Sequence, residues 1–388
     1  MLLSLRGRIA LSVSVISLAA AAGAVGATVP AQAASPRKQA VTTRLNIPGG
    51  FLDGVAVISA SSAWAVGSAG GGSTRLPTRT LVLHWNGRTW AQVTDPRPVD
   101  GALQAVSAAS ADSVWAVGYS DNAKGEDVKS LIMRWNGKAW QRDTTAPQLP
   151  NASLEAVTAT ANGVWAVGST DLYNPLIMHR VGGRWYVVPA EGAPHGQLQG
   201  VAVTGARTAW AIGNWLPGSL YVIHPFLLRW NGSVWRSVPF PLQSANGDLY
   251  GVAAGPSGTA WAVGHSLDEE FPGGPVFTPI SMRFNGKTWQ KVPVPVPAHG
   301  DLSSVAFVPG GTAWALGDTN TKNGGSEYSL SLRWTGTEWT PVKIPDDAND
   351  GLEAMAGTSP DNVWGVGASS SGSSWMPLVL HWNGRTWS

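Results

Sequence analysis

The 388-residue sequence contains no cysteine. This absence excludes disulfide bonds and a lipid-anchored cysteine. The fold must therefore be held together by its apolar core. A chain of this length can bury enough surface for that purpose.

An excess of charge of one sign is also missing. Residues 1–33 contain two of the 26 basic residues and none of the 24 acidic ones, so the rest of the chain is balanced at 24 of each. No basic patch stands out along the chain. We therefore expect no nucleic-acid partner, which would need such a patch.

Long apolar runs are scarce, and the one present lies at the N-terminus. Arg6 and Arg8 precede a mostly apolar stretch over residues 9–29, and Ala31-Gln32-Ala33 follows it. A positive start, an apolar run and a small-x-small site are typical of a secretory signal peptide. We predict a signal peptide at residues 1–33, a flexible mature N-terminus at 34–40 and a secreted, extracellular protein without a membrane span. A retained membrane helix is the less favoured alternative, because glycine and proline interrupt the run.

Tryptophan is abundant instead, and 19 of its 21 copies fall at three positions of an internal repeat. One repeated element is a hairpin in which a tryptophan follows the opening residue by five positions. Its seven copies are Trp85/Trp90, Trp135/Trp140, Arg180/Trp185, Trp230/Trp235, Phe284/Trp289, Trp334/Trp339 and Trp382/Trp387. Five copies carry Asn-Gly between the arms, which predicts a tight turn with positive φ. The exceptions are Val181-Gly182 and Thr335-Gly336.

Two further strands precede each hairpin. The first has a small residue before an apolar one, as in Gly54-Val55, and the second is a Trp-Ala-Val-Gly-like strand that ends at glycine, as in Trp64 to Gly67. Small residues at one fixed position are typical of strands that converge on an axis.

Four short strands per unit of about 50 residues predict an all-β fold, a seven-bladed β-propeller over residues 41–388. The repeat units are expected at about 51–100, 101–150, 151–195, 196–246, 247–299, 300–349 and 350–388. The last unit stops where its outer strand should begin, whereas Arg44-Leu45-Asn46-Ile47-Pro48 resembles the outer strand of the sixth unit. We therefore predict that residues 41–48 complete the last blade and close the ring, beside the arm that contains His381 and Trp382.

The repeated tryptophans are interpreted as packing between blades. The residue before each hairpin's opening position can always carry positive charge: His84, Arg134, His179, Arg229, Arg283, Arg333 and His381. A cation or imidazole over a neighbouring ring is a sufficient structural reason for this pattern. A ring of ligands is the functional alternative.

The repeat resembles the units of seven-bladed propellers of the photosystem II assembly-factor and BNR (Asp-box) type, with a looser similarity to kelch propellers. The resemblance covers about residues 42–388 and implies the fold rather than an activity. Thr-Trp of the Asp-box pattern survives at Thr89-Trp90, Thr288-Trp289 and Thr386-Trp387, but the Ser and Asp of that pattern are missing. A sialidase-like activity is therefore not implied.

Candidate ligand-binding residues lie in the loops that escape the repeat, on the face opposite the Asn-Gly turns. They are Trp215, Trp375, Tyr119, Tyr173, Tyr221, His265 and Phe271, with Tyr328 and the acidic Asp268, Glu269 and Glu270 nearby. Aromatics beside small polar residues favour a sugar or peptide site. The alternative is that these rings cover the ends of neighbouring strands.

The motifs of common enzymes are absent: no G-x-S-x-G elbow, no H-E-x-x-H and no P-loop occur. We predict no catalytic residues, no metal and no cofactor. The expected function is that of a secreted, monomeric, non-catalytic binding module that favours carbohydrate. An extracellular protein-interaction scaffold is the alternative, and a glycan-active hydrolase or lyase is the third.

Overall fold

The computed structural model describes residues 43–70, 78–93, 99–122, 127–170, 173–215, 222–242, 246–268, 276–296, 299–310, 312–320, 327–345, 350–371 and 374–388. Residues 1–40, predicted to be a signal peptide and a mature N-terminus, lie outside this part. The elements below all belong to one compact unit, Ala40–Ser388.

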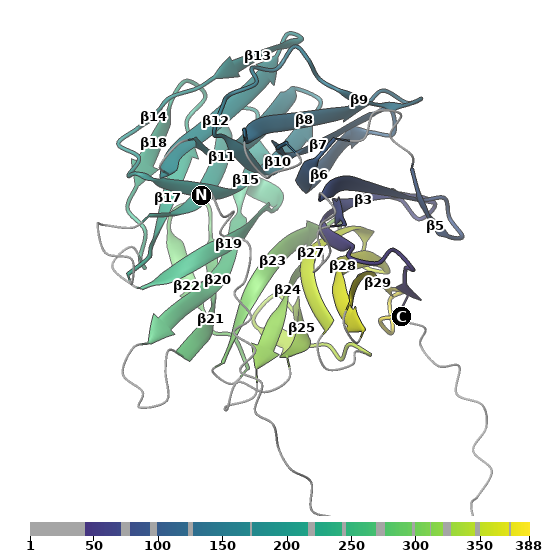
Figure 1. Cartoon of the computed structure of the whole chain (residues 1–388). Helices are drawn as coiled ribbons and strands as arrows, with labels where there is room; N and C mark the ends of the chain where they lie inside the picture. Colours follow the sequence, from purple (N-terminus) through teal and green to yellow (C-terminus); the bar gives the residue numbers. More distant parts are fainter. Residues whose placement is uncertain are drawn as a thin grey trace, which may run out of the picture. The chain divides into compact units, whose positions relative to one another are not determined.

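Seven sheets contain the described strands, and each is built in the order inner, second, third, outer (Figure 1). The inner strands are β2 (Phe51–Ser59), β6 (Gly101–Ser110), β10 (Ser153–Thr160), β15 (Gly196–Gly205), β19 (Gly247–Ala254), β23 (Gly300–Val308) and β27 (Asp350–Ser359). The second strands are β3 (Ser62–Ala69), β7 (Ser113–Ser120), β11 (Gly163–Thr170), β16 (Thr208–Trp215), β20 (Ala260–Asp268), β24 (Thr312–Asn320) and β28 (Asn362–Ser371).

The third strands are β4 (Arg79–Trp85), β8 (Lys129–Trp135), β12 (Asn174–Val181), β17 (His224–Trp230), β21 (Val276–Phe284), β25 (Glu327–Trp334) and β29 (Ser374–Trp382). The outer strands are β5 (Trp90–Gln92), β9 (Trp140–Arg142), β13 (Arg184–Val187), β18 (Trp235–Val238), β22 (Trp289–Val292), β26 (Trp339–Pro341) and β1 (Thr43–Arg44). The fourth sheet gains a fifth strand, β14 (Ala190–Glu191), which pairs in parallel with β18. The described residues include a short 3₁₀ turn, η2 (Pro256–Gly258), and are otherwise almost free of helix.

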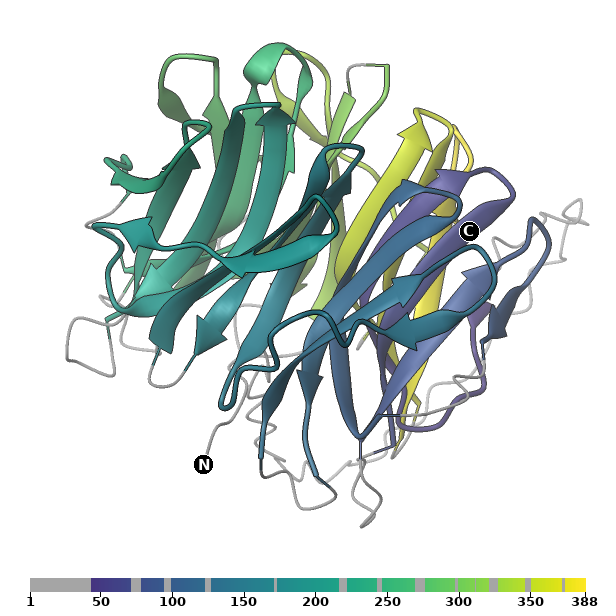
Figure 2. The same ribbon diagram turned by 90° about the horizontal axis from the view of Figure 1, so that it is seen from above.

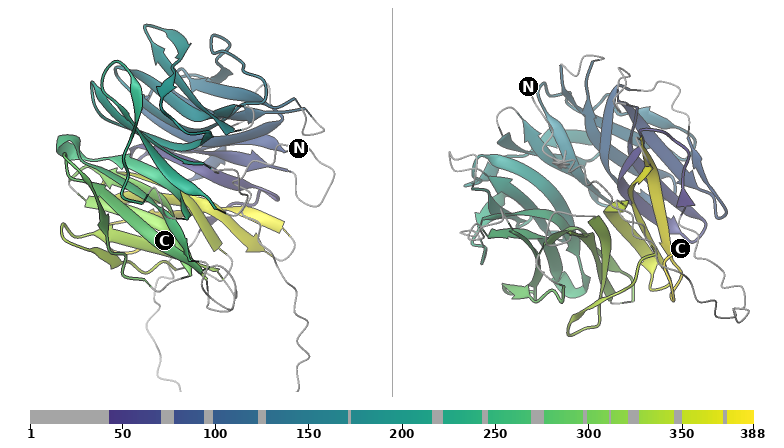
Figure 3. Two further views of the ribbon diagram at one scale, coloured as in Figure 1. Left: turned by 90° about the vertical axis from the view of Figure 1, so that its left-hand side faces the viewer. Right: turned by 60° about the horizontal axis from the view of Figure 1, so that its bottom comes forward.

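The sheets are the blades of a propeller. Each inner strand contacts the inner strand of the next blade, and β27 of the last blade returns to β2 of the first. The first strands and the last strands accordingly lie side by side (Figures 2 and 3). The seven-bladed, all-β fold predicted from the repeat is confirmed.

A β-bulge in every inner strand explains two of the repeated sequence positions. In the first blade the pairing register shifts between Leu52 and Gly54, so that Asp53 is the extra residue of the bulge. A Cβ on Gly67 of the second strand would overlap the carbonyl oxygen of Phe51, which makes glycine necessary there. A Cβ on Gly54 would lie 3.0 Å from Cα of Ala105 in the next blade, which confirms the crowding predicted from the small residues.

Seven apolar clusters form the core, and each fills the space between two consecutive blades. One of them joins Leu52 and Leu83 of the first blade to Trp364 and Val379 of the last. Both faces of a blade are therefore buried, which is why the strands alternate only weakly between apolar and polar residues.

The repeated tryptophans organise these interfaces, as predicted. Trp64 of β3 packs against His84 of its own blade at 4.2 Å between ring centroids. On its other side it meets two tryptophans of the second blade, Trp135 at 4.8 Å and Trp140 edge-on at 5.2 Å. The same arrangement recurs at five other interfaces, and at the remaining one Trp115 meets Arg180 and Trp185 of the third blade.

The arginine or histidine side chain that precedes each hairpin's opening residue lies over the second-strand tryptophan of its own blade in all seven blades. Three are ring contacts, at Trp64–His84, Trp165–His179 and Trp364–His381, and four are cation–π contacts, at Trp115–Arg134, Trp210–Arg229, Trp261–Arg283 and Trp314–Arg333. Burial lowers the pKa of all three imidazoles, so they pack as neutral rings at neutral pH. The structural interpretation of these residues is confirmed.

In a two-residue turn of the expected type, both the asparagine and the glycine would have positive φ. The Asn-Gly hairpins of this structure differ from that expectation. Only the glycine has positive φ, for example 91° at Gly87. The Asn86 side chain instead accepts hydrogen bonds from the backbone amides of Arg88 and Thr89, at 2.9 and 3.0 Å. Thr335 replaces the asparagine in the sixth blade, where its hydroxyl accepts from the amide of Glu338 at 3.2 Å.

The N-terminal strand closes the ring, as predicted, although its partner residues differ. Thr43 and Arg44 pair with Val379 and Leu378 of β29. The outer position beside His381 and Trp382 is occupied by the C-terminus itself, where Trp387 bridges Trp382 and Ser388 exchanges two backbone hydrogen bonds with His381. The outer strand of the last blade is thus made of two pieces, one from each end of the chain.

An ion pair between a partly exposed arginine and a buried carboxylate fixes the N-terminal piece, and its removal tests the closure. Arg44 lies 3.0 Å from the carboxylate of Asp350, whose side chain is 1% exposed, and also donates to Ser369 at 2.8 Å. We expect Arg44→Ala to lower the free energy of unfolding by about 2 kcal/mol, because a buried carboxylate loses a charged partner. Denaturant unfolding measures this change.

The control is Arg88→Ala, at an exposed hairpin tip, which we expect to change stability by less than about 0.5 kcal/mol. Deleting residues 35–44 should have a larger effect than Arg44→Ala and promote association through the uncovered edge of β29. A truncated chain that melts like the intact one and stays monomeric would show that the closure contributes nothing.

Candidate functional site

The connections at the two ends of the blades differ in how much their length and composition vary from blade to blade. The short turns between inner and second strands and the seven hairpin tips lie at one end, called here the turn face. The loops between second and third strands, and the links from each outer strand to the next blade, lie at the other, the loop face. The loops differ in length and composition from blade to blade, so differences between blades concentrate on the loop face.

Large aromatic side chains are exposed at the loop face. Tyr173, Phe277 and Trp375 occupy the same position in the third, fifth and seventh blades. In each blade this position lies three residues before the third-strand residue that pairs with the glycine of the second strand. They are 40, 39 and 38% exposed. Tyr328 lies one position later in the sixth blade and is 44% exposed. Large rings exposed at a recurring position provide flat apolar surfaces for a ligand.

Trp375 does not stand alone. Its ring centroid lies 5.5 Å from that of Phe51, the first residue of β2, and the two rings are tilted by 38°. Phe51 is itself 36% exposed. The backbone beside the pair is fixed, because the amide of Gly49 donates to the carbonyl oxygen of Trp375 at 2.8 Å. The first and last blades thus share a rigid aromatic surface.

Phe277 adjoins a polar group in the fifth blade. Its ring meets the buried His265 edge-on at 4.7 Å, and His265 Nε2 lies 3.9 Å from Asp248 Oδ2. Tyr250, the bulged residue of β19, donates its hydroxyl to Asp248 at 3.5 Å. The exposed ring therefore contacts a buried imidazole, and behind that imidazole lie a carboxyl and a hydroxyl group.

The electrostatics of this group are unusual for a carboxyl. Burial raises the pKa of Asp248 to about 6; the Tyr250 hydrogen bond lowers it, and the charge of Asp301 raises it. Asp248 therefore exchanges its proton near neutral pH, unlike an ordinary surface aspartate.

Tyr119 of the second blade occupies the position that His265 has in the fifth, since each directly follows the second-strand glycine of its blade. Burial raises the pKa of its phenol, and Asp121, Asp53 and Glu155 raise it further. Tyr119 consequently remains a neutral hydroxyl at physiological pH. It can donate or accept a hydrogen bond, but it does not serve as a phenolate.

The remaining predicted residues are placed less favourably or lie outside the described residues. Trp215 is the last residue of β16, half-buried against the core between the third and fourth blades, with His224 5.5 Å away. Tyr221 and Phe271 fall outside the described residues, as do Glu269 and Glu270. Trp375, Tyr119, Tyr173 and His265 all reach the loop end of different blades, and they do not form one compact cluster.

Sequence reasoning missed Phe51, Phe277, Asp248 and Tyr250. Phe51 and Asp248 are equivalent residues that precede the inner-strand leucine, and Tyr250 directly follows that leucine. For Tyr250 the repeat contained a signal that could have been used: the residue after this leucine is polar or a tyrosine in every blade. These residues are Asp53, Gln104, Glu155, Gln199, Tyr250, Ser303 and Glu353.

Within the described ranges, no group of three or more His, Asp or Glu side chains could hold a metal ion. No helix in that part of the chain is long and apolar enough to cross a bilayer.

The architecture defines the class of protein: the chain is a seven-bladed β-propeller. Its sequence matches no protein-family model. No curated protein matches it either.

Solved structures with the same fold are numerous but distant in sequence. A structure of YCF48 bound to D1 peptide is 16% identical, covering 76% of this chain and 82% of that one with a TM-score of 0.50. The propeller domain of the Trilobed protease from Pyrococcus furiosus, described as having an open velcro topology, is 9% identical over 86% and 95% with a TM-score of 0.51. U3-55K is 7% identical over 87% and 97% with a TM-score of 0.52. These similarities establish the fold.

The proton on Asp248 gives a pH-dependent prediction. Because the folded state holds this proton more tightly than the unfolded chain, stability falls as pH rises from about 4 to about 6 and stays lower above that range. Asp248→Asn removes the ionisation. We expect the variant to be more stable than the parent at pH 7.5, on the order of 2 kcal/mol, with a much smaller difference at pH 4.

Denaturant unfolding at the two pH values measures the effect. Asp361→Asn, at an exposed turn, should change stability equally at both pH values and serves as the control. Equal stabilities of Asp248→Asn and the parent at pH 7.5 would show that burial does not raise the pKa of this carboxyl.

Proposed function

We propose that the chain is a secreted, non-catalytic binding module that takes carbohydrate on its loop face. The observation that carries this proposal is the recurrence of an exposed aromatic residue at one position of three blades: Tyr173, Phe277 and Trp375. Exported status is supported by the N-terminal pattern of Arg6, Arg8 and Ala31-Gln32-Ala33.

The surroundings of these rings favour a sugar over a purely apolar ligand. A sugar ring presents C–H groups on one face and hydroxyls at its edge, so it needs a flat apolar surface with hydrogen-bonding groups beside it. Phe277 has such groups in His265, Asp248 and Tyr250. The Phe51–Trp375 pair offers a larger apolar surface for a second residue of an extended glycan.

A protein-interaction scaffold is the second candidate, and a different surface favours it. Val181 and Tyr186 of the third blade lie on the same face of the neighbouring strands β12 and β13, where they are 45 and 50% exposed. Adjacent apolar side chains on the outer edge of a blade are typical of a docking surface. A glycan-active hydrolase or lyase remains the third candidate, and the raised pKa of Asp248 is the observation in its favour.

A glycan array with the intact chain tests the proposal. We expect selected glycans to bind, and Trp375→Ala or Phe277→Ala to weaken that binding at least tenfold, because each removes a stacking surface. Tyr186→Ala is the matched control, since it removes an even more exposed ring from another surface and should leave glycan binding unchanged.

The alternatives give different results. An array without any bound glycan, or binding that survives both loop-face substitutions, would overturn the carbohydrate assignment. Cleavage of the bound glycans, lost in Asp248→Asn, would replace it with the catalytic candidate.

A further inference from the structure

The third blade departs from the repeat at Arg180, and the departure lies on the turn face, away from the aromatics discussed above. The other six blades place an aromatic residue at this position, and that ring packs on the second-strand tryptophan of the preceding blade, as Trp135 does on Trp64. Here Arg180 lies over Trp115 instead, 4.9 Å from the ring centroid. A flexible guanidinium thus replaces an indole.

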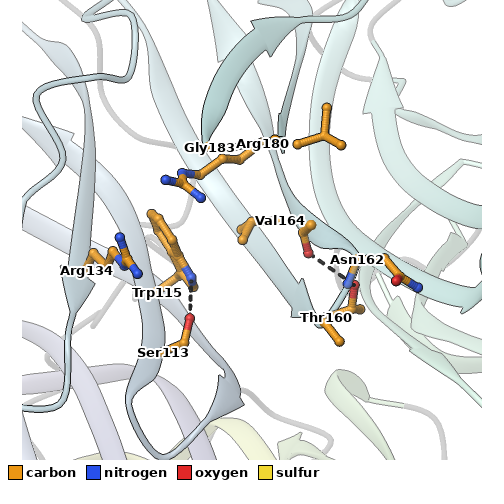
Figure 4. A pocket seen from close by; sticks show the side chains of 12 residues that line it. Ser113, Trp115, Arg134, Thr160, Asn162, Val164, Arg180 and Gly183 are labelled. Atoms are coloured by element: carbon orange, nitrogen blue, oxygen red, sulfur yellow. Dashed lines mark hydrogen bonds between the residues drawn. The ribbon is translucent and has the colours of Figure 1, made fainter.

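A cavity of about 270 Å³ opens at this place between the second and third blades (Figure 4). The hairpin beside it has the tip Gly182-Gly183, with φ of 59° and 83°, and so contributes no side chains that would fill the space. The opposite wall is formed by the turn at Thr160 and Asn162. The cavity is therefore a direct result of the two departures of this hairpin from the repeat.

The wall is cationic. Arg134 and Arg180 both line the cavity and flank Trp115, at 5.1 and 4.9 Å from its ring centroid (Figure 4). None of the residues that line it within the described part of the chain is acidic. The nearest compensation is Asp143, 3.7 Å from Arg180 Nε. Burial would raise the pKa of Asp143, but hydrogen bonds from Thr145 and Trp185 and the charge of Arg180 lower it on balance, so it is ionised.

The two arginines differ in how their buried Nε atoms are compensated. Neither Nε makes a hydrogen bond in the described structure, but Arg180 Nε has the Asp143 carboxylate 3.7 Å away. Such donors are costly unless a ligand or solvent satisfies them. Arg134, furthermore, forms no ion pair among the described residues, so an anion in the cavity would be its first counter-charge.

We propose that this cavity binds the carboxylate of an acidic sugar residue, a uronate. Arginine guanidinium groups pair with carboxylates through two parallel hydrogen bonds. Ser113 and Asn162 lie on the same wall, where sugar hydroxyls can bond. The Ser113 hydroxyl accepts from Trp115 Nε1 at 3.3 Å and keeps its own proton to donate, whereas the Thr160 hydroxyl is already bonded within its turn, donating to Gly163 O and accepting from the Asn162 backbone amide. The volume suits a single sugar ring, since it lies below the range of sites for larger ligands. This site is independent of the loop-face proposal.

The test compares ligands by isothermal titration calorimetry at pH 7.5. We expect glucuronate to bind the intact chain and glucose, which lacks the carboxylate, to bind at least tenfold more weakly. Arg180→Trp restores the aromatic found in five other blades, so it should fold at least as well as the parent while filling the cavity and abolishing glucuronate binding. A thermal melt checks that it is folded.

Arg134→His tests the second cation without disturbing the fold. Histidine occupies this position in the first blade, where His84 Nε2 lies 3.2 Å from the hydroxyl of Ser62, the equivalent of Ser113. The variant should weaken glucuronate binding at least tenfold, whereas Arg333→His, the same change in the sixth blade, should not. Absence of binding to the parent chain, or undiminished binding to Arg180→Trp, would overturn the proposal. Equal affinities for inorganic sulfate and glucuronate would overturn the assignment to a sugar.

Discussion

The structure depends on one interaction repeated around the ring, a tryptophan held between two blades. Trp64 has an imidazole of its own blade on one side and two indoles of the next blade on the other. Aromatic pairs and cation–π contacts each contribute about 0.5–1.5 kcal/mol beyond the area they bury. Without cysteine to link the blades, this contact and the aliphatic clusters around it align each blade with the next.

The position of that contact explains why variation gathers at one end of the blades. Each second-strand tryptophan is the second or third residue of its strand, close to the turn face. The loop ends need only close packing of glycine, alanine and leucine, so the loops beyond them are free to differ. Exposed rings such as Trp375 and Phe277 occur there because no neighbouring blade needs them for packing.

The repeat allowed the blade number, the interblade role of the tryptophans and the closure by the N-terminus to be predicted. The blade number and the role of the tryptophans follow from spacings that recur in every unit. The closure follows from the outer strand that the last unit lacks. The residues of a site could not be predicted in the same way, because they meet across blades. Phe51 and Trp375 are neighbours through ring closure, and Asp248 acquires its unusual pKa from burial that the sequence does not display. Arg180 was visible as an exception to the hairpin pattern, but the cavity beside it depends on how the next blade packs.

The two-piece outer strand of the last blade has a consequence for biosynthesis. Arg44 and its partner Asp350 are 306 residues apart in the sequence. Residues 43–44 therefore emerge from the ribosome long before β29, the strand with which they pair. Blades one to six can accumulate in order, but the ring stays open until β29 has been made. A nascent chain that still lacks β29 cannot reach the native state.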